Sequence, residues 1–580
     1  MRKALRILFK LVLTLVLVLA LAVWLLWLLP FWGMPFNASR HTQVPVTPPW
    51  ALECWLWEDD TNTAAAVMEL VDGYEKIDFP ARTILIDSPW SMRYNDFKLD
   101  TARYPEPEKF FKTLQDRGYR VVLWMTPMVN SKSDDTAITE SEDWHKEAAS
   151  KGYTAAGDYQ VKWWKGKGGF IDYTNPAAMT WWRGLQQQVF DWGIDGWKLD
   201  DSATYFTSTI GGIPIPWQKT SKGWMSTRGY MDHYYRDELA HGKTQNPDFI
   251  TLSRSMDGSG LLSHPEGFAP HDAATVNWVG DQDHEWTAEK EGLQEALNYI
   301  LNSANKGYNI IGSDVAGYSG GEIPPRLYIR WAQFSAFCGL FLNGGHDERR
   351  MWLRSPEELE IIRRFAWLHT ELIPYMYSYT VRCSKGGRPL MKPIEGKYQY
   401  LFGDDFLVAP VFEDSLTRTV QLPAGEWRYL FDDKTVVTGP QTITRDFPLA
   451  EAPVYVRAGS IVPLQVKREY TGFGTRESEK FLTWAIYPSG KTAFTCVHPS
   501  GAGESTLTVD AASNAITVSV DGVKIPHILR VHSDRKPASI ELDGAPLTEG
   551  AQWAYDEAKQ KVVVTTDNNT ATKYVISFGE

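Results

Sequence analysis

The sequence predicts an α/β protein: a (β/α)8 TIM barrel followed by two C-terminal β-sandwich domains, with an N-terminal transmembrane helix. Eight short apolar strands alternate with helical segments over about 330 residues, the pattern of a barrel with insertions. After Gly387, β-branched and aromatic runs alternate with Gly, Pro and Asp turns, as in β-sandwiches. The run from Leu11 to Leu29 is uncharged and long enough to span a bilayer.

The N-terminal segment has the charge distribution of a membrane anchor. Four basic residues precede the apolar run: Arg2, Lys3, Arg6 and Lys10. Three indoles, which favour the membrane interface, lie at its far end: Trp24, Trp27 and Trp32. We therefore expect a single-pass membrane protein with a cytoplasmic N-terminus and its catalytic domain on the outer, periplasmic or lumenal side. A cleaved signal peptide is the alternative, but its apolar core is shorter, roughly 7 to 15 residues.

The barrel strands are expected at eight short, mostly apolar runs. They are Ala51–Trp57, Thr83–Trp90, Tyr119–Pro127, Ile194–Asp200, Phe249–Ser255, Ala274–Asp281, Tyr308–Asp314 and Leu340–Gly345. Helices are expected at Glu106–Arg117, Pro176–Trp192, Glu289–Lys306 and Glu357–Tyr379. Residues 128–170 are polar and rich in Lys, Gly and Trp, and are predicted to be a long loop. A doubly wound open sheet is the alternative, but no glycine-rich phosphate loop follows the first strand.

These elements divide the chain into five predicted segments. They are a cytoplasmic stub and transmembrane anchor at 1–36, a stalk at 37–48, the catalytic barrel at 49–387, a proximal β-sandwich at 388–465 and a distal β-sandwich at 466–580.

The composition indicates which classes of molecule the protein binds. A net charge of -12 argues against nucleic acid, which favours basic surfaces. The 25 tryptophans suit stacking on sugar rings, although core packing explains most of them. The histidines form no HExxH motif, and we expect neither a metal nor a cofactor. The oligomeric state stays open.

Asp200 is the first candidate for catalysis. It ends a predicted strand, and the carboxyl ends of barrel strands form the active site. Alternate strand residues share a face, so Lys198 points the same way and would keep Asp200 ionised. An ionised carboxylate is what a glycosidase nucleophile requires. A structural Lys–Asp pair at a strand end explains the spacing equally well.

Asp281 is the second candidate. Gly280 lets the backbone turn and bring the acid over the pocket, and partial burial beside Trp278 would raise its pKa so that it carries a proton. A turn-capping aspartate is the alternative explanation. Asp283 and His284 are neighbouring candidates for the same role.

Other polar residues end neighbouring strands. Asp87 and Asp314 can bind sugar hydroxyls through charge-assisted hydrogen bonds, and Arg254 can orient a carboxylate. His346, in a glycine-rich loop, can contact a ligand hydroxyl or can be an ordinary loop histidine. Considered alone, each of these residues more often has a structural role. Polar residues at the ends of five strands together favour a functional site.

The motifs, taken in order, resemble glycoside hydrolase family 31, the retaining α-glucosidases, α-xylosidases and relatives. The matching segments are Ile84–Trp90 with the family's sugar-binding Asp, Asp172–Pro176 with its "D.TNP", Lys198–Asp200 with its nucleophile motif, Ser253–Ser255 with its Arg-Ser, Trp278–Asp281 with its acid/base motif and Gly312–Tyr318 with its "DigGf". The resemblance implies that Asp200 is the nucleophile and Asp281 the acid/base. It implies substrate-binding roles for Asp87, Trp90, Lys198, Arg254, Trp278, Asp314 and His346, although the family's histidine aligns with either His346 or Asn343.

The chain departs from the family in two places. Asp201-Ser202-Ala203 stands where members often have Phe-Gly-Glu, and before the barrel there is room only for the anchor and stalk, where most members carry a β-sandwich.

The sequence therefore predicts a membrane-anchored retaining α-glycosidase, a glycoside hydrolase that cleaves O-glycosyl bonds at terminal α-linked sugars. If the mechanism retains configuration, the two carboxyl groups should lie about 5 to 5.5 Å apart. An α-xylosidase, an α-galactosidase or a transglycosylase on the same site are the alternatives. The alternative from another class of protein is a carbohydrate-binding protein without catalytic activity. The absence of the Glu of the Phe-Gly-Glu segment is the observation that suggests it.

Overall fold

The computed structural model describes residues 2–28, 43–155, 157, 160–200, 208–210, 213–256, 269–566 and 572–579. The chain divides into two compact units. The first comprises Met1–Thr42, Asn62–Ala64 and Ile86–Ala274, and the second comprises Gln43–Thr61, Ala65–Leu85 and Thr275–Glu580.

The described residues include an eight-stranded sheet in the order β14-β13-β12-β7-β3-β2-β1-β15. Its strands are β1 Cys54–Leu56, β2 Ala81–Ile86, β3 Arg120–Met125, β7 Gly196–Leu199, β12 Ile250–Arg254, β13 Val276–Trp278, β14 Ile311–Gly312 and β15 Phe341–Asn343. β1 pairs in parallel with β2 and β15, β7 with β3 and β12, and β13 with β14. A parallel bridge between Asp314 and Leu342 links the chain after β14 to β15, so the sheet nearly closes. The predicted barrel is confirmed.

Two helices of the first unit, α6 and α7, begin at side-chain caps. α6 (Pro176–Asp191) begins with proline, whose missing N–H costs nothing in the first turn, and the Asn175 side chain accepts a hydrogen bond from the backbone N–H of Ala177 at 3.0 Å. Ser226 caps α7 (Thr227–Gln245) by accepting from the N–H of Gly229 at 3.1 Å. α4 (Pro107–Asp116) and α6 confirm the two helices predicted in this region.

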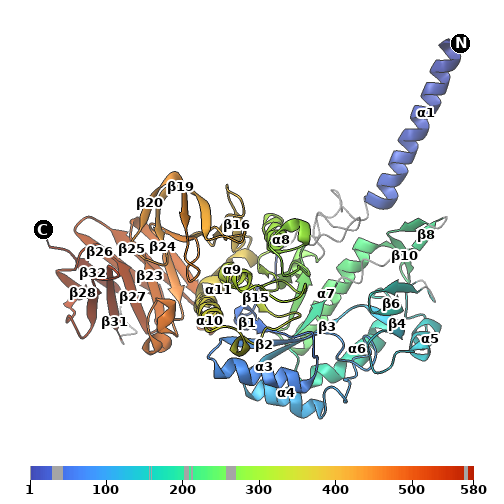
Figure 1. Ribbon diagram of the computed structural model, residues 1–580, viewed down its shortest axis with the longest axis horizontal. Coiled ribbons are helices and arrows are strands. Elements are labelled where there is room, and N and C mark those ends of the chain that lie inside the picture. Colours follow the sequence, from blue (N-terminus) through green and yellow to red (C-terminus); the bar gives the residue numbers. More distant parts are fainter. Residues whose placement is uncertain are drawn as a thin grey trace. The chain divides into compact units, whose positions relative to one another are not determined.

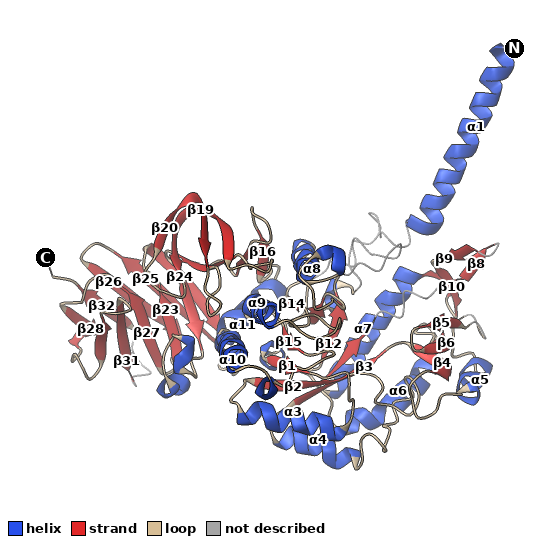
Figure 2. Cartoon of the chain, viewed as in Figure 1, coloured by secondary structure: helices blue, strands red, loops and turns tan. Residues whose placement is uncertain are grey.

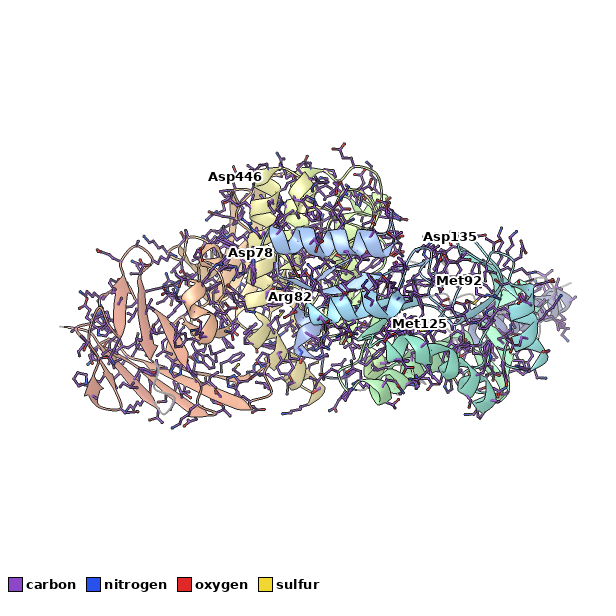
Figure 3. The ribbon with its side chains drawn as sticks, turned by 90° about the horizontal axis from the view of Figure 1, so that it is seen from below. Asp78, Arg82, Met92, Met125, Asp135 and Asp446 are labelled. Atoms are coloured by element: carbon purple, nitrogen blue, oxygen red, sulfur yellow. The ribbon has the colours of Figure 1, made fainter. Side chains whose placement is uncertain are left out.

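The segment after β3 is more ordered than predicted. Instead of a long loop, it contains β4 (Met128–Ser133), α5 (Glu142–Ser150), β5 (Val161–Trp163) and β6 (Gly166–Phe170), with strand order β4-β6-β5. Its glycines allow close pairing, because a Cβ on Gly166 would lie 2.0 Å from the carbonyl oxygen of Lys132. The N–H of Ile138 donates to the carbonyl of Met92 at 2.8 Å, which ties this segment to the chain after β2 (Met92 and Asp135 are labelled in Figure 3).

Two further hairpins of the first unit precede α7. They are β8 (Ser208–Ile210) with β9 (Ile213–Ile215), and β10 (Trp217–Thr220) with β11 (Gly223–Ser226).

The second unit has one helix break that the sequence pattern did not predict. Its longer helices are α3 Ala64–Lys76 (Ala64 itself belongs to the first unit), α8 Leu293–Asn305, α9 Pro325–Ser335, α10 Pro356–Glu371 and α11 Ile373–Ser384. The single helix expected at Glu357–Tyr379 is divided at Leu372, because Pro374 lacks an N–H and its ring obstructs the preceding turn. Short 3-10 helices are η3 Pro49–Leu52, η6 His271–Ala273, η7 Ala288–Lys290, η8 Met351–Leu353, η9 Glu469–Thr471 and η10 Arg476–Lys480; all but η6 lie in the second unit.

From β16 onward, strands joined by loops are the main regular structure, whereas helices and strands alternate before it (Figure 2). An antiparallel sheet in the order β16-β17-β18-β21-β19-β20 consists of β16 Met391–Pro393, β17 Tyr400–Phe402, β18 Phe406–Val408, β19 Thr417–Tyr429, β20 Val436–Asp446 and β21 Val454–Arg457. A buried cluster that includes Trp427, Tyr429 and Tyr455 packs on it.

Two more sheets complete the second unit. One has the order β22-β23-β27-β31-β30, with β22 Ile461–Leu464, β23 Leu482–Ile486, β27 His527–His532, β30 Trp553–Asp556 and β31 Lys561–Thr566. The other has the order β24-β25-β26-β32-β28-β29, with β24 Gly490–Val497, β25 Glu504–Ala511, β26 Ala515–Gly522, β28 Ser539–Leu542, β29 Ala545–Pro546 and β32 Lys573–Ser577. Inner residues of β25 and β26 alternate with more exposed ones, as expected for a sheet with one face in a core.

The N-terminal apolar run is helical. α1 (Arg2–Val23) continues into a π-helical turn, η1 (Trp24–Leu28), as one rod (Figure 1). The helical segment Arg2–Leu26 is long and apolar enough to cross a membrane. A signal sequence at this position has the same property.

Candidate active site

A buried ion pair joins two of the predicted site residues. Nζ of Lys198 lies 2.6 Å from Oδ2 of Asp87, and both residues are buried. The second carboxylate oxygen of Asp87 accepts from the backbone N–H of Ser88 at 2.8 Å. The sequence pattern suggested that Lys198 pairs with Asp200. Lys198 pairs with Asp87 instead, and this contact joins the residues that follow β2 to those of β7.

Asp200 follows β7 and is held at both carboxylate oxygens. Nε1 of Trp124 donates to Oδ2 at 2.9 Å, and Nε of Arg254 donates to Oδ1 at 3.1 Å. Asp200 is 6% exposed and Arg254 7% exposed. Such charge-assisted donors stabilise a negative charge on Asp200 and fix its direction. The prediction that Arg254 orients a carboxylate agrees with this geometry.

The register of the parallel strands explains why these side chains meet. Trp124 lies opposite Lys198 in the β3–β7 pair, and Ser253 lies opposite Leu199 in the β7–β12 pair, so the next residues, Arg254 and Asp200, lie side by side. Trp124 was not predicted as a site residue. Its position near the end of a barrel strand was the only signal in the sequence. Its contact with Asp200 depends on β3 lying next to β7, which the sequence does not show.

Trp90 supports this arrangement from the loop after β2. Its indole N–H donates to the carbonyl oxygen of Trp124 at 2.8 Å, and the side chain is buried. The contact anchors the end of β3 that carries Trp124. Binding of substrate by Trp90 stays a prediction.

Asp281 follows β13 in the second unit. Gly280 has φ +92°, a conformation that glycine adopts without strain, and Asp281 is exposed. The expected partial burial beside Trp278 is wrong, because Trp278 packs inside with no exposed surface while the turn at Gly280 carries Asp281 to the surface.

The two neighbouring candidates for the acid role, Asp283 and His284, make structural contacts with other loop residues. Oδ1 of Asp283 accepts from the hydroxyl of Ser319 at 3.3 Å. His284 is buried, with Nδ1 2.6 Å from the carbonyl oxygen of Gly321 and Nε2 3.1 Å from Nη2 of Arg349. Burial lowers the pKa of His284, so its ring is neutral near pH 7. Both residues hold the loop after β14.

His346 belongs to a polar cluster formed by three loops. Its Nδ1 lies 2.7 Å from Oδ1 of Asp60, and its Nε2 lies 3.0 Å from the hydroxyl of Tyr318. The Tyr318 hydroxyl also contacts Oδ2 of Asp59 at 2.6 Å. The loops follow β1, β14 and β15, all at carboxyl ends of barrel strands, and sequence reasoning missed Asp59, Asp60 and Tyr318.

An aromatic stack supports this cluster. The rings of Trp57 and Tyr318 lie 5.6 Å apart at 13°. Gly344 makes room for the indole, because a Cβ there would lie 1.4 Å from Cδ1 of Trp57. The glycine in this loop is therefore required by packing.

Asn343, the alternative match to the family histidine, is structural. It is buried, its Nδ2 donates to the Tyr74 hydroxyl at 2.8 Å, and its Oδ1 accepts from the Tyr328 hydroxyl at 2.5 Å. Asp314, two residues after the end of β14, is also buried.

Some predicted features lie outside the described residues, namely the Asp201-Ser202-Ala203 departure and the indole of Trp32. Within the described ranges, no group of three or more His, Cys, Asp or Glu side chains is arranged to hold a metal ion.

Comparison with known families gives two matches. Residues 44–379 match the glycosyl hydrolases family 31 TIM-barrel domain, and residues 389–462 match the glycosyl hydrolase family 31 C-terminal domain. The chain is similar to an isomaltosyltransferase of Sporosarcina globispora (25% identity, over 94% of this chain and 54% of the relative). It is also similar to the alpha-xylosidase XylQ of Lactiplantibacillus pentosus (25% identity, over 87% of this chain and 66% of the relative).

Solved structures share the fold. A family 31 dextranase of Flavobacterium johnsoniae in complex with glucose superposes with a TM-score of 0.80 at 22% identity, over 92% of this chain and 71% of that chain. A cycloalternan-forming enzyme of Listeria monocytogenes has a TM-score of 0.78 at 20% identity, over 93% of this chain and 55% of that chain. This chain spans between about half and two thirds of the length of the two curated relatives named above.

Proposed function

The chain belongs to glycosyl hydrolase family 31, and from this premise we propose that it is a retaining α-glycosidase that acts on terminal α-linked sugars. The observation that carries the proposal is the environment of Asp200. Its carboxylate follows a barrel strand, and both oxygens accept hydrogen bonds, from Trp124 and Arg254. A carboxylate that is charged, buried and fixed in direction has the properties of a nucleophile in this chemistry.

In the first step, an oxygen of Asp200 attacks the anomeric carbon as the glycosidic bond breaks. The leaving oxygen takes the proton of Asp281, and a covalent glycosyl-enzyme results. In the second step, the Asp281 carboxylate removes a proton from water, and the water oxygen attacks the anomeric carbon and releases Asp200. Two inversions retain the configuration.

The remaining predicted residues would bind the sugar. Asp87 can accept hydrogen bonds from sugar hydroxyls while Lys198 keeps it charged and fixed. His346 is held by its contacts with Asp60 and Tyr318, which fix the direction of its ring, and the proposal assigns it a contact with a sugar hydroxyl. Substrate-binding roles for Trp90, Trp278 and Asp314 rest on the family resemblance, and all three residues are buried.

Transfer to a sugar acceptor is the second candidate. The observation that favours it is the match over 94% of the chain to a protein named isomaltosyltransferase. The mechanism is the same until the glycosyl-enzyme forms, and an acceptor hydroxyl then replaces water. α-Xylosidase activity has a similar basis in the match to XylQ.

The test uses the full chain in detergent with aryl α-glucosides, α-xylosides and α-galactosides. We expect hydrolysis of one class, with an α-configured first product by NMR, and at least about a thousandfold loss of kcat in Asp200→Asn and a large loss in Asp281→Asn. Addition of free glucose or maltose as acceptor measures transfer. Turnover of Asp200→Asn near the parent rate would refute the assignment, and binding without hydrolysis would indicate a carbohydrate-binding protein.

Two matched controls separate chemistry from folding. Asp195 precedes the same strand at its opposite end, where it pairs with Arg120 at 2.8 Å, so Asp195→Asn should lower stability and leave kcat near the parent value. Asp283→Asn tests the neighbour of Asp281 and should keep most activity, since its carboxylate only holds Ser319.

Membrane anchoring is part of the proposal. The basic residues before the helix favour a cytoplasmic N-terminus and an external catalytic part. Recovery of the intact chain in washed membranes, with the barrel digested by external protease, would support this. A soluble mature form that begins after the helix would identify a cleaved signal sequence instead.

A further inference from the structure

The hairpin of β10 and β11 has one outward face that carries two indoles. Lys219 lies opposite Trp224 in the antiparallel register, and Trp217 precedes Lys219 by two residues. Alternate strand residues share a face, as do residues directly opposite each other, so these three side chains lie on one face. Trp224 is 65% exposed and Lys219 is exposed, whereas Gln218 and Thr220 on the other face are buried. We call the face formed by Trp217, Lys219 and Trp224 the outer face of the hairpin.

The hairpin is tied to the rest of the first unit at both of its ends. At the turn, the backbone N–H of Ser221 donates to Oδ2 of Asp172 at 2.7 Å, and the hydroxyls of Ser221 and Thr174 lie 2.8 Å apart. At the open end, the N–H of Thr227 donates to the carbonyl oxygen of Pro216 at 2.9 Å. These contacts, together with the buried opposite face, fix the direction in which the outer face points.

The outer face meets the end of the N-terminal helix. The indole N–H of Trp217 donates to the backbone carbonyl oxygen of Leu26, in η1, at 3.0 Å. Leu26 is three residues before Leu29, the last residue of the uncharged apolar run, and this is about 5 Å along a helix. If the helix spans a bilayer, Leu26 lies at the boundary of the hydrocarbon core on the side where the chain leaves the membrane. The outer face is therefore at the level of the lipid headgroups.

The composition of the outer face suits that level. An indole combines a large apolar ring with one N–H donor, and it is enriched where acyl chains meet headgroups. The stem of Lys219 can lie along the apolar layer while its ammonium stays among the lipid phosphates. Exposed apolar side chains that gather on one face indicate an interaction surface. The contact with Leu26 identifies lipid as the partner, because it holds this face against the segment that leaves the bilayer.

We propose that the outer face of the β10–β11 hairpin is a membrane-contact surface, with Trp217 and Trp224 in the headgroup layer and Lys219 at the lipid phosphates. The inference rests on the membrane anchoring in the proposed function and adds a second attachment to it. The first unit is then held to the bilayer by the helix and by the hairpin, which restricts its tilt over the membrane surface.

The test measures the depth of a nitroxide label on the full chain in nanodiscs of phosphatidylcholine and phosphatidylglycerol. The four native cysteines are buried, so a thiol-reactive label reaches an introduced cysteine. Trp224→Cys places the label on the outer face, and Glu108→Cys places it at an exposed residue of α4 as the control. The label at 224 should collide more with oxygen, which concentrates in lipid, than with a water-soluble nickel complex. The control label should show the reverse.

A second measurement keeps an aromatic ring at the position. Nanodiscs that contain brominated phospholipid quench the emission of indoles that touch lipid. Trp224→Phe should lose part of the quenched emission of the parent. Trp164→Phe is the matched control, because Trp164 is 43% exposed in the turn between β5 and β6, and it should leave the quenched emission unchanged.

A label at 224 that prefers the nickel complex, or equal quenching in the parent and Trp224→Phe, would overturn the inference. Normal cleavage of an aryl α-glycoside by the same samples would then show that the membrane-contact surface alone is wrong. A lipid-buried label in a chain that cleaves no α-glycoside would support the surface and refute the glycosidase assignment alone. A mature chain that lacks the helix and stays in the aqueous fraction would refute the anchoring and the surface together.

Discussion

Glu371 is the group whose charge state should most visibly change the stability of the second unit. It ends α10, its side chain is fully buried, and its Oε1 accepts from the backbone N–H groups of Lys467 at 2.6 Å and Arg468 at 2.9 Å. Burial raises its pKa from 4.5 to about 7, against the opposing effect of those N–H groups. The carboxyl therefore keeps its proton in the native state at pH values where the unfolded chain has lost it.

The sign of the effect follows from proton uptake. Between about pH 4.5 and 7 the native state binds more protons than the unfolded state, so the free energy of unfolding falls as pH rises. The full penalty, present above pH 7, is about 3 kcal/mol at roughly 1.4 kcal/mol per pH unit. Glu371→Gln keeps the accepting oxygen and has no charge to bury, so it should remove most of this penalty.

The assay is calorimetric unfolding of parent and Glu371→Gln at pH 5, 6, 7 and 8. The variant should match the parent at pH 5 and gain stability progressively up to pH 7 to 8. Glu477→Gln, at an exposed glutamate of η10, is the control and should show no such trend. A Glu371→Gln effect that is independent of pH, or a variant less stable than the parent at pH 8, would refute the reasoning.

Three further substitutions test the barrel. Trp124→Phe removes the donor to Oδ2 of Asp200 and should lower kcat/KM about ten- to a hundredfold and destabilise the protein by about 1 to 3 kcal/mol, because a buried oxygen loses this donor, as measured by steady-state kinetics and melting; unchanged kcat/KM would contradict the positioning role. Lys198→Met deprives buried Asp87 of its ammonium partner and should destabilise the protein by about 3 to 5 kcal/mol in urea unfolding, whereas a neutral effect would show that the pair is dispensable. Gly184→Ala, at an exposed position of α6 where a Cβ meets nothing within 4 Å, should stabilise by about 0.5 to 1 kcal/mol, and a loss of stability would contradict the helix geometry.

The sequence was sufficient for the barrel because its signals are local. Each predicted strand overlaps an observed one, and helices such as α6 begin at a capping asparagine followed by proline. Local signals were insufficient where the strands lack apolar alternation, as in β4, β5 and β6, which were predicted to be a loop. The break between α10 and α11 was present in the sequence as Pro374 but was outweighed by the apolar pattern around it.

In the candidate site, too, local features could be predicted from the sequence, whereas contacts that depend on the fold could not. That Asp200 follows a strand was readable from the sequence, whereas its contact with Trp124 required the register of β3 against β7. Asp60 and Tyr318 were missed because they contact His346 across loops far apart in the chain. The burial expected for Asp281 was wrong, because a turn at glycine can direct the next side chain either way.

The most direct test of the central claim is covalent trapping of the nucleophile. The full chain is inactivated with a 5-fluoro-α-glycosyl fluoride of the sugar that it cleaves, then digested and analysed by mass spectrometry. The account predicts one added sugar per chain on the peptide that contains Asp200, and none in Asp200→Asn. A label on any other residue, or turnover through an inverting reaction with no labelled intermediate, would contradict it.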